Sequence, residues 1–146
     1  DNQKLLAKLA AIAGSRILVV EDNELNQEVA LGLLQGEGFV VEIANNGKEA
    51  VDMVSTNAYD IVLMDCQMPV MDGLEATRQI MARCACPIIM LSSLTERNSV
   101  TTIKALELGA VDFIAKKSSF DLKAAILAVV SPIPKPISKI FGLFEP

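Results

Sequence analysis

The stretch Asp60-Ile61-Val62-Leu63-Met64 decides the fold, because it is a short apolar run that leads straight into the carboxylate of Asp65. Four other runs of similar length occur along the chain. Most are rich in valine and isoleucine, and several lack polar alternation, which is typical of strands covered on both faces. The sequence therefore predicts five buried strands, of which the other four lie at residues 16–20, 39–44, 87–91 and 111–115.

The segments between these runs have helical spacing and helical boundary signals. Apolar side chains recur on one face of each segment, as in an amphipathic helix. The positions that share a face are Leu25, Val29 and Leu33, then Ala50 and Val54, then the less regular set Leu74, Arg78 and Met81, then Val100, Ile103 and Leu106, and finally Leu122, Ile126 and Val129. Helices are expected to end at Gly36, Gly38 and Gly109, and to open at Asn45-Asn46-Gly47, Asp72-Gly73 and Ser118-Ser119.

Strand and helix alternate five times along the chain, which predicts an α/β fold. Parallel neighbours need a crossover connection, so the pattern predicts a doubly wound, five-stranded parallel sheet with helices on both faces. The flavodoxin-like strand order 2-1-3-4-5 is the common solution for a chain of this size. The predicted α/β domain covers residues 15–130. It follows an N-terminal helical extension at residues 1–14 and precedes a proline-rich linker and short apolar tail at residues 131–146.

Composition narrows the chemistry that this chain of 146 residues can perform. It contains no histidine, so any chemistry rests on carboxylates, hydroxyls, amines and bound metal rather than on a Ser-His, Cys-His or His-metal apparatus. The net charge of −5 argues against a nucleic-acid partner. Cys66, Cys84 and Cys86 are too few for a disulfide framework and wrongly spaced for a zinc site, which favours a reducing, cytoplasmic location. No apolar run is long enough to span a membrane.

Polar side chains follow four of the predicted strands at the point where each strand ends. Glu21 and Asp22 follow the first strand, and Asp65 follows the third. These strands are neighbours in the predicted order, so three carboxylates would crowd one crevice, and like charges that close require a cation or a proton. Mg²⁺ is the expected cation, because it prefers oxygen ligands and keeps several waters. Ser92 and Lys116 follow the fourth and fifth strands, where they would supply donors and countercharge to a phosphoryl group on Asp65.

Each of these residues also has an ordinary structural interpretation. Glu21-Asp22 would suit a solvated loop or a helix cap, and Asp65 would suit a turn. Ser92 would suit a polar strand end, and Lys116 would suit the surface. The conjunction of all of them at one edge of the sheet favours a phosphoryl site over the separate interpretations.

Four stretches of the chain resemble the receiver domain of response regulators. They have the order and spacing of that family, and the resemblance covers about residues 15–130. The pattern D-x-x-M-P-x-M-D-G is its most specific part. The four stretches are Ile17-Leu18-Val19-Val20-Glu21-Asp22-Asn23, Ile61-Val62-Leu63-Met64-Asp65-Cys66-Gln67-Met68-Pro69-Val70-Met71-Asp72-Gly73, Pro87-Ile88-Ile89-Met90-Leu91-Ser92-Ser93 and Gly109-Ala110-Val111-Asp112-Phe113-Ile114-Ala115-Lys116.

The resemblance implies a phosphoacceptor and a set of Mg²⁺ ligands. Asp65 would be the phosphorylated carboxylate and would also bind the metal. Asp22 would be a direct Mg²⁺ ligand, and Glu21 would hold a metal-bound water. The main-chain carbonyl of Gln67 would be the remaining protein ligand.

The resemblance also implies a switch. Ser92 and Lys116 would bind the phosphoryl group, and Phe113 would swing inward when Ser92 moves. The bistable element would be the face formed by the fourth helix, the fifth strand and the fifth helix, which would contact a downstream protein or domain. The family usually has a cis-proline directly after the lysine, whereas Lys117 stands there in this chain. A trans bond at that point would shift Lys116 and weaken its pairing with the phosphoryl group.

Since the chain lacks histidine, the phosphoryl donor would be a histidine kinase or a histidine phosphotransfer domain elsewhere. The chain would assist its own phosphorylation rather than act as an enzyme in the usual sense. Gln67 and Leu94 occupy the family positions that tune self-dephosphorylation, and neither is an acid or a base. We therefore expect slow loss of the phosphoryl group.

Three other functions compete with this interpretation. An aspartyl-phosphate hydrolase of the haloacid-dehalogenase type would need an acid at Gln67, so it is disfavoured. A flavodoxin would need a phosphate-binding loop where Glu21-Asp22-Asn23-Glu24 would repel phosphate. A degenerate receiver that serves only as a docking or dimerisation module stays open. So does the parent architecture, because residues 23–27 resemble receivers of hybrid histidine kinases, whereas residues 92–95 and 105–113 resemble those of chemotaxis methylesterases.

Overall fold

The five predicted strands are present, and each lies within one residue of its predicted run. The computed structural model describes residues 2–66, 68, 70–84, 86–92, 100–115 and 126–127. The strands are Arg16–Val20 (β1), Val40–Ala44 (β2), Ile61–Asp65 (β3), Ile88–Ser92 (β4) and Asp112–Ala115 (β5). Branched apolar side chains dominate them, and such side chains pack well on a pleated surface.

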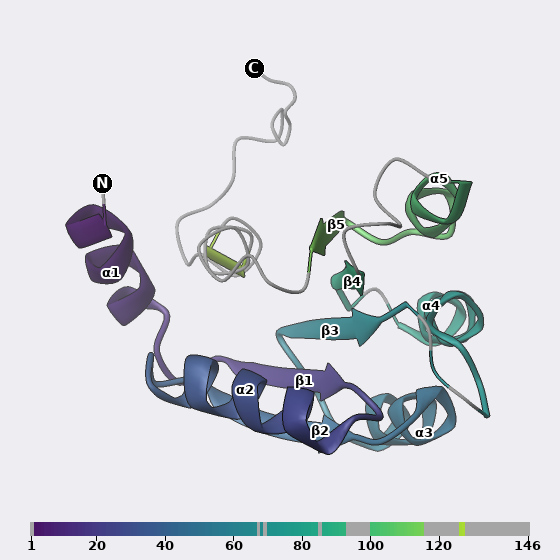
Figure 1. Cartoon of the computed structure of the whole chain (residues 1–146), viewed down its shortest axis with the longest axis horizontal. Coiled ribbons are helices and arrows are strands. Elements are labelled where there is room, and N and C mark those ends of the chain that lie inside the picture. The colour runs from purple at the N-terminus through teal and green to yellow at the C-terminus, as the bar shows by residue number, and fades with distance from the viewer. Residues whose placement is uncertain are drawn as a thin grey trace.

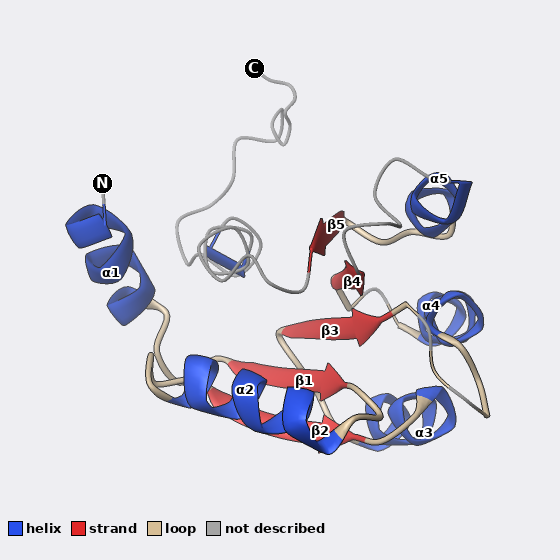
Figure 2. Ribbon diagram, in the orientation of Figure 1, coloured by secondary structure: helices blue, strands red, loops and turns tan. Residues whose placement is uncertain are grey.

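The strands form one parallel sheet in the order β2-β1-β3-β4-β5. This confirms the predicted doubly wound sheet and its flavodoxin-like order. In Figures 1 and 2 the arrows of β1 and β3 point the same way, toward the side where α3 and α4 begin. Ligands of such sheets bind outside the carboxyl ends of the strands where the strand order reverses, which here is between β1 and β3.

Helices occupy the predicted crossovers. They are α2 (Glu24–Gln35), α3 (Gly47–Thr56), α4 (Gly73–Arg83) and α5 (Val100–Glu107). The side chains of Asn23, Asn46 and Asp72 accept backbone N–H groups at the starts of α2, α3 and α4. The caps of α3 and α4 lie in the turns that were predicted to open these helices. Residues 126–127 are helical, while Ser118-Ser119 and the rest of the predicted fifth helix lie outside the described residues.

Alternate side chains along the strands enter two separate apolar cores. Leu18 and Val20 of β1 pack with residues of α3, α4 and α5. Ile17 and Val19 face the opposite way and pack with α2 and with Ile126. The predicted placement of helices on both faces of the sheet is therefore confirmed, and β1 and β3 are covered on both sides, as their unbroken apolar sequences indicate.

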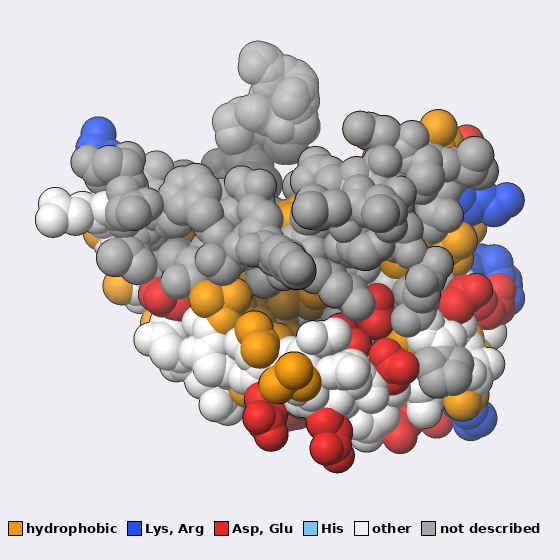
Figure 3. Space-filling model, viewed as in Figure 1, with side chains coloured by type: hydrophobic (Ala, Val, Ile, Leu, Met, Phe, Trp, Pro, Cys, Tyr) orange, Lys and Arg blue, Asp and Glu red, His pale blue; other side chains and the backbone are white. Residues whose placement is uncertain are grey.

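The apolar stripe of α2 does not mark the buried side of this helix. Leu34 is fully buried, whereas Leu25 and Val29 are 69% and 62% exposed. Figure 3 shows apolar side chains on the visible surface over α2. In α5, likewise, Ile103 is exposed and Ala105 is buried. Helical spacing thus identified the helices, but small and C-terminal residues make the contact with the sheet.

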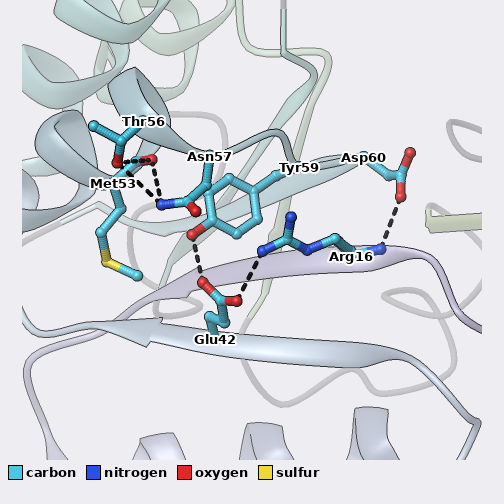
Figure 4. Close-up of polar contacts among 7 residues, drawn as sticks. All are labelled: Arg16, Glu42, Met53, Thr56, Asn57, Tyr59 and Asp60. Atoms are coloured by element: carbon cyan, nitrogen blue, oxygen red, sulfur yellow. Dashed lines mark hydrogen bonds and ion pairs between the residues drawn. The ribbon is translucent and has the colours of Figure 1, made fainter.

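A polar network ties β1 and β2 to the start of β3 at the amino end of the sheet (Figure 4). The Tyr59 hydroxyl donates to Glu42 Oε1 at 2.6 Å, and Arg16 Nη2 donates to Glu42 Oε2 at 2.8 Å. The Arg16 guanidinium also lies over the Tyr59 ring, 5.1 Å from its centroid. The bonds from Tyr59 and Arg16 hold the pKa of Glu42 below its usual value. Burial and the bond to Glu42 raise the pKa of Tyr59 to about 12.

An N-terminal helix, α1 (Asn2–Ala11), precedes the sheet. Ile12, directly after it, is buried in the same core as Leu34 and Ile126. The division of the chain at residues 14 and 130 stays a prediction, and the proposed linker and tail lie outside the described residues. No helix in the described part of the chain is long and apolar enough to cross a membrane.

Candidate functional site

Three carboxylates converge at the carboxyl ends of β1 and β3. One carboxylate oxygen from each of Glu21, Asp22 and Asp65 lies within 4.8 Å of the others. Asp65 is the last residue of β3, and Glu21 and Asp22 directly follow β1. Figure 3 shows acidic side chains on the visible surface beside the carboxyl ends of these strands. The sequence predicted this cluster from the acids that follow two strands and from the assumed order of those strands.

Burial separates the roles that the three acids can take. Asp65 is 2% exposed and Glu21 is 5% exposed, whereas Asp22 is exposed. The solvated-loop interpretation is therefore wrong for Glu21, and the cap of α2 is Asn23 rather than either acid. One Glu21 oxygen accepts the Asn23 backbone N–H at 3.2 Å. Asp22 is left as the acid that is most open to solvent and to an arriving cation.

The Gln27 side chain ties the loop after β1 to the loop after β2. The Gln27 side-chain amide donates to the Glu21 carbonyl oxygen at 2.6 Å and to Asn45 Oδ1 at 2.8 Å. The Glu21 backbone N–H in turn donates to the Ala44 carbonyl oxygen at 3.0 Å. The Glu21 backbone is thereby held between the ends of β1 and β2.

The sheet register brings two further strand ends to the same edge. Asp65 pairs with Leu91 in β4, so Ser92 lies one residue beyond the phosphoacceptor candidate. Ser92 pairs with Ala115, the last residue of β5, and Lys116 follows it in sequence. Phe113 lies within β5. Gln67, Lys116 and Lys117 lie outside the described residues, and the roles given to Ser92 and Phe113 stay predictions.

Sequence reasoning missed the glycines that shape the loop between β3 and α4. A methyl group on Gly73 would collide with the Asp65 carbonyl oxygen, and one on Gly47 would lie 2.5 Å from the Met71 carbonyl oxygen. The Gly73 N–H donates to the Cys66 carbonyl oxygen at 3.1 Å and closes the loop. The sequence marked Gly47 and Gly73 only as helix openers, because such contacts exist only in three dimensions.

The donor set of the acidic cluster fits Mg²⁺. Two buried carboxylates and one exposed carboxylate within 4.8 Å would repel one another strongly without a countercharge. All three offer oxygen, and Mg²⁺ is bound in proteins through a few carboxylates while it keeps several waters. The exposed position of Asp22 leaves room for those waters.

A hollow in the described part of the chain lies beside the end of α3, and none of the three acids lines it. It has a volume of about 380 Å³ and is lined by the end of α3, by Tyr59, and by Cys84 and Cys86. Cys86 Sγ donates to the Tyr59 carbonyl oxygen at 3.4 Å, and burial raises the pKa of this thiol to about 12. The three cysteines are free thiols. A thiol with so high a pKa is a poor nucleophile, so the chemistry of the chain is better sought at the carboxylates.

Comparison with known proteins agrees with this geometry. The response regulator receiver domain family matches residues 17–127. The chain is similar to the receiver domain of a sensor histidine kinase from Pseudomonas aeruginosa PAO1, solved with a magnesium ion in its active-site cleft. The identity is 34% and the TM-score 0.73, over 81% of this chain and 98% of that one. It is also similar to the response regulator domain of Thermotoga maritima CheB, with 32% identity and a TM-score of 0.75 over 83% and 99% of the two chains.

Curated relatives share only part of their length with this chain. A protein-glutamate methylesterase/protein-glutamine glutaminase of Carboxydothermus hydrogenoformans is 44% identical over 69% of this chain. One from Methanococcus maripaludis is 42% identical over 70% of this chain. The match covers 29% of each relative. The chain thus spans less than a third of the length of these relatives.

Proposed function

This chain belongs to the response regulator receiver domain family, and on that premise we propose that it is the phosphoacceptor of a two-component phosphorelay, with Asp65 as the phosphorylated residue. The observation that carries the proposal is the cluster of Glu21, Asp22 and Asp65 at the switch point of the sheet. Three carboxylates this close together, two of them buried, favour a bound cation, and phosphoryl transfer to a carboxylate needs such a cation beside it.

The proposed reaction is transfer of a phosphoryl group from a phosphohistidine. An Asp65 carboxylate oxygen attacks phosphorus, the phosphorus–nitrogen bond breaks, and the histidine nitrogen leaves with the electron pair. The chain has no histidine, so the donor is a histidine kinase or a histidine phosphotransfer domain. The exposed apolar side chains of Leu25 and Val29 lie on α2, the helix that begins directly after Asn23, and would suit docking of that donor.

We assign Mg²⁺ to the acidic cluster. Asp22 and Asp65 would bind it directly, Glu21 would bind it through a water, and the Gln67 carbonyl would complete the protein ligands. When bound, Mg²⁺ neutralises the charge that gathers on the carboxylates and on the incoming phosphoryl oxygens. The protein contributes by holding Asp65 buried at a strand end, where its carboxylate has little freedom to turn away.

Phosphorylation is proposed to switch one face of the domain. It adds a charge of about −1.5 to −2 at Asp65, which calls for new charge-assisted bonds from the Ser92 hydroxyl and the Lys116 ammonium. The loops after β3 and β4 then move inward together with Phe113. The affected face is formed by α5, β5 and the helix that contains residues 126–127. Its exposed apolar residues Ile103, Leu106 and Val111 would contact a downstream protein or domain.

Esterase chemistry is not assigned to this chain, because its methylesterase relatives match it over less than a third of their length. Neither parent architecture is favoured, since the structural relatives come from a histidine kinase and from a methylesterase. A docking or dimerisation module without phosphorylation is the alternative function. It predicts an acidic cluster that binds no Mg²⁺.

The test is incubation with acetyl phosphate and Mg²⁺, followed by intact-mass measurement. The unmodified chain should gain the mass of one phosphoryl group, and omission of Mg²⁺ should prevent the gain. Asp65→Asn should not react, whereas the matched control Asp52→Asn, an exposed acid on α3, should react like the unmodified chain. A gain by Asp65→Asn, or none by the unmodified chain, would refute the proposed function.

A further inference from the structure

The loop between β3 and α4 lies against the backbone of Gly47, the first residue of α3. It runs from Cys66 to Gly73 and carries Gln67, the residue whose carbonyl is the proposed fourth Mg²⁺ ligand. The Gly73 N–H closes the loop on the Cys66 carbonyl oxygen. Met68 is buried in the core that α3 and α4 cover, and Met71 packs partly against it. Met68, Met71 and Gly73 therefore hold the described part of this loop against the rest of the domain.

Gly47, the first residue of α3, is the support on the far side of this loop. A Cβ atom there would lie 2.5 Å from the Met71 carbonyl oxygen, 3.1 Å from Met71 Cβ and 3.0 Å from Ala76 Cβ. A real Cβ atom does not tolerate the first contact, so the Met71 backbone lies where only glycine at position 47 permits it. The opposing atom is main chain, which cannot rotate away as the end of a long side chain can.

Helix propensity favours alanine over glycine at position 47. Among the described glycines only Gly14, Gly38 and Gly109 have a positive φ, so the backbone of Gly47 accepts alanine. Alanine is the better helix former, and it restricts the unfolded chain more than glycine does. Glycine at the start of α3 is thus unfavourable for the helix itself, and the close approach of Met71 supplies the reason for it.

We propose that Gly47 is a positioning residue for the phosphoryl site, because it lets the Met71 carbonyl rest on α3 and so fixes the loop that directly follows Asp65. This inference rests on the proposed function. A side chain at position 47 would displace Met71, and the displacement would pass along the short loop toward Asp65. Mutation of a group that helps to orient a metal ligand typically lowers metal affinity about 10–100-fold.

The experiment compares Gly47→Ala with Gly32→Ala. Gly32 lies inside α2, has no positive φ, and has room for an added methyl group, which would meet nothing within 4 Å, so it is a matched glycine-to-alanine change in open space. Mg²⁺ is titrated against amide NMR signals of each folded variant. Phosphorylation by acetyl phosphate is then measured as a function of Mg²⁺ concentration, and thermal unfolding is recorded in parallel without Mg²⁺.

Gly47→Ala is expected to weaken Mg²⁺ binding about tenfold or more and to raise by the same factor the Mg²⁺ concentration needed for half-maximal phosphorylation, with most of the maximal rate retained. Gly32→Ala should match the unmodified chain in both measurements. A merely structural role would lower the unfolding temperature and leave the Mg²⁺ affinity of the folded variant unchanged, and that result would overturn the inference.

A measurement on the unmodified chain covers the case in which Gly47→Ala does not fold. The amide signals of Gly47 and Met71 should shift during the Mg²⁺ titration with the same midpoint as that of Asp22, while the Gly32 signal stays in place. Stationary Gly47 and Met71 signals in a chain that does bind Mg²⁺ would overturn the positioning role alone. A chain that neither binds Mg²⁺ nor accepts a phosphoryl group would refute the proposed function as well.

Discussion

At the residue scale, the acidic cluster sets stability and metal binding against each other. Asp22, Glu21 and Asp65 bring three carboxylates within 4.8 Å of one another, so their like charges repel. A cation reverses the sign of this effect. The same side chain should therefore be unfavourable to folding in one buffer and favourable in another.

Asp22→Asn tests this reversal. Without Mg²⁺ the variant should be more stable to urea than the unmodified chain by about 1 kcal/mol, because one of three neighbouring charges is gone. At a Mg²⁺ concentration tenfold above its dissociation constant the unmodified chain should gain about 1.4 kcal/mol, and the variant much less. Asp52→Asn is the control for loss of an exposed acid. If Mg²⁺ stabilised Asp22→Asn as much as the unmodified chain, Asp22 would not be a ligand.

Val70 tests whether the loop beside Asp65 stores backbone strain. It has φ of 70°, which is rare for a β-branched residue, and it is 78% exposed, so little burial offsets the cost. Val70→Asn should raise the free energy of unfolding by about 0.5–1 kcal/mol, because asparagine tolerates this conformation. Val111→Asn, at an exposed valine of ordinary φ, should give no gain in urea denaturation. An equal effect of the two changes would exclude strain at Val70.

The sequence predicted that the three carboxylates lie together, but it did not predict the glycine contacts that shape the loop beside them. Glu21, Asp22 and Asp65 could be placed together because each adjoins the end of an apolar run, and parallel strands end at one edge. Glycine is required at positions 47 and 73 by the carbonyl oxygens of Met71 and Asp65, which belong to other parts of the sequence. No local pattern distinguishes a glycine that opens a helix from one that a neighbouring carbonyl requires.

At the scale of elements, the strands were predicted more accurately than the helix faces. An unbroken apolar run leaves few alternatives for a strand covered on both sides, so the strand bounds agree within one residue. A helix tolerates exposed apolar residues, and α2 carries Leu25 and Val29 on its solvent side. The buried contact falls on Leu34, near the end of α2, because that part of the helix packs against the second core.

Glu42 of β2 is bonded to Arg16 of β1 and to Tyr59, which lies just before β3. Its contribution to the stability of the fold should depend on pH. The bonds from Tyr59 and Arg16 lower its pKa in the folded chain, so the ionised form stabilises the fold. This stabilisation is complete above the ordinary value of 4.5 and is lost as pH falls through the lowered pKa. Glu42→Gln should therefore cost about 1 kcal/mol at neutral pH, since the pair is partly exposed.

The measurement for Glu42→Gln is urea denaturation from pH 7 to pH 3. The difference between the variant and the unmodified chain should shrink as the solution becomes more acidic than pH 4.5. Glu28→Gln, an exposed acid on α2, is the control. A difference that grew in acid would contradict the proposed network, because it would mean that Glu42 is stabilised in its neutral form.

At the scale of the whole molecule, one end of the sheet carries a bonded polar network and the other carries the proposed phosphoryl site. The amino end is held together by Arg16, Glu42 and Tyr59, which form a network of charged and aromatic contacts. The carboxyl end gathers the three acids and the last residues of β4 and β5. Charge added at Asp65 would therefore act on the ends of β4 and β5, while the opposite end stays fixed. Movement is expected at the face of α5 and β5 rather than throughout the domain.

Acceptance of a phosphoryl group by Asp65, with Mg²⁺, is proposed to switch this face. Its most direct test is an amide NMR comparison of the chain before and after addition of beryllium fluoride and Mg²⁺, which together mimic the phosphoryl group on an aspartate. We predict shifts at Asp22, at Asp65 and across α5 and β5, unchanged signals at Arg16 and Glu42, and no response from Asp65→Asn beyond that to Mg²⁺ alone. The same shifts in Asp65→Asn, or none in the unmodified chain, would contradict the phosphoacceptor role.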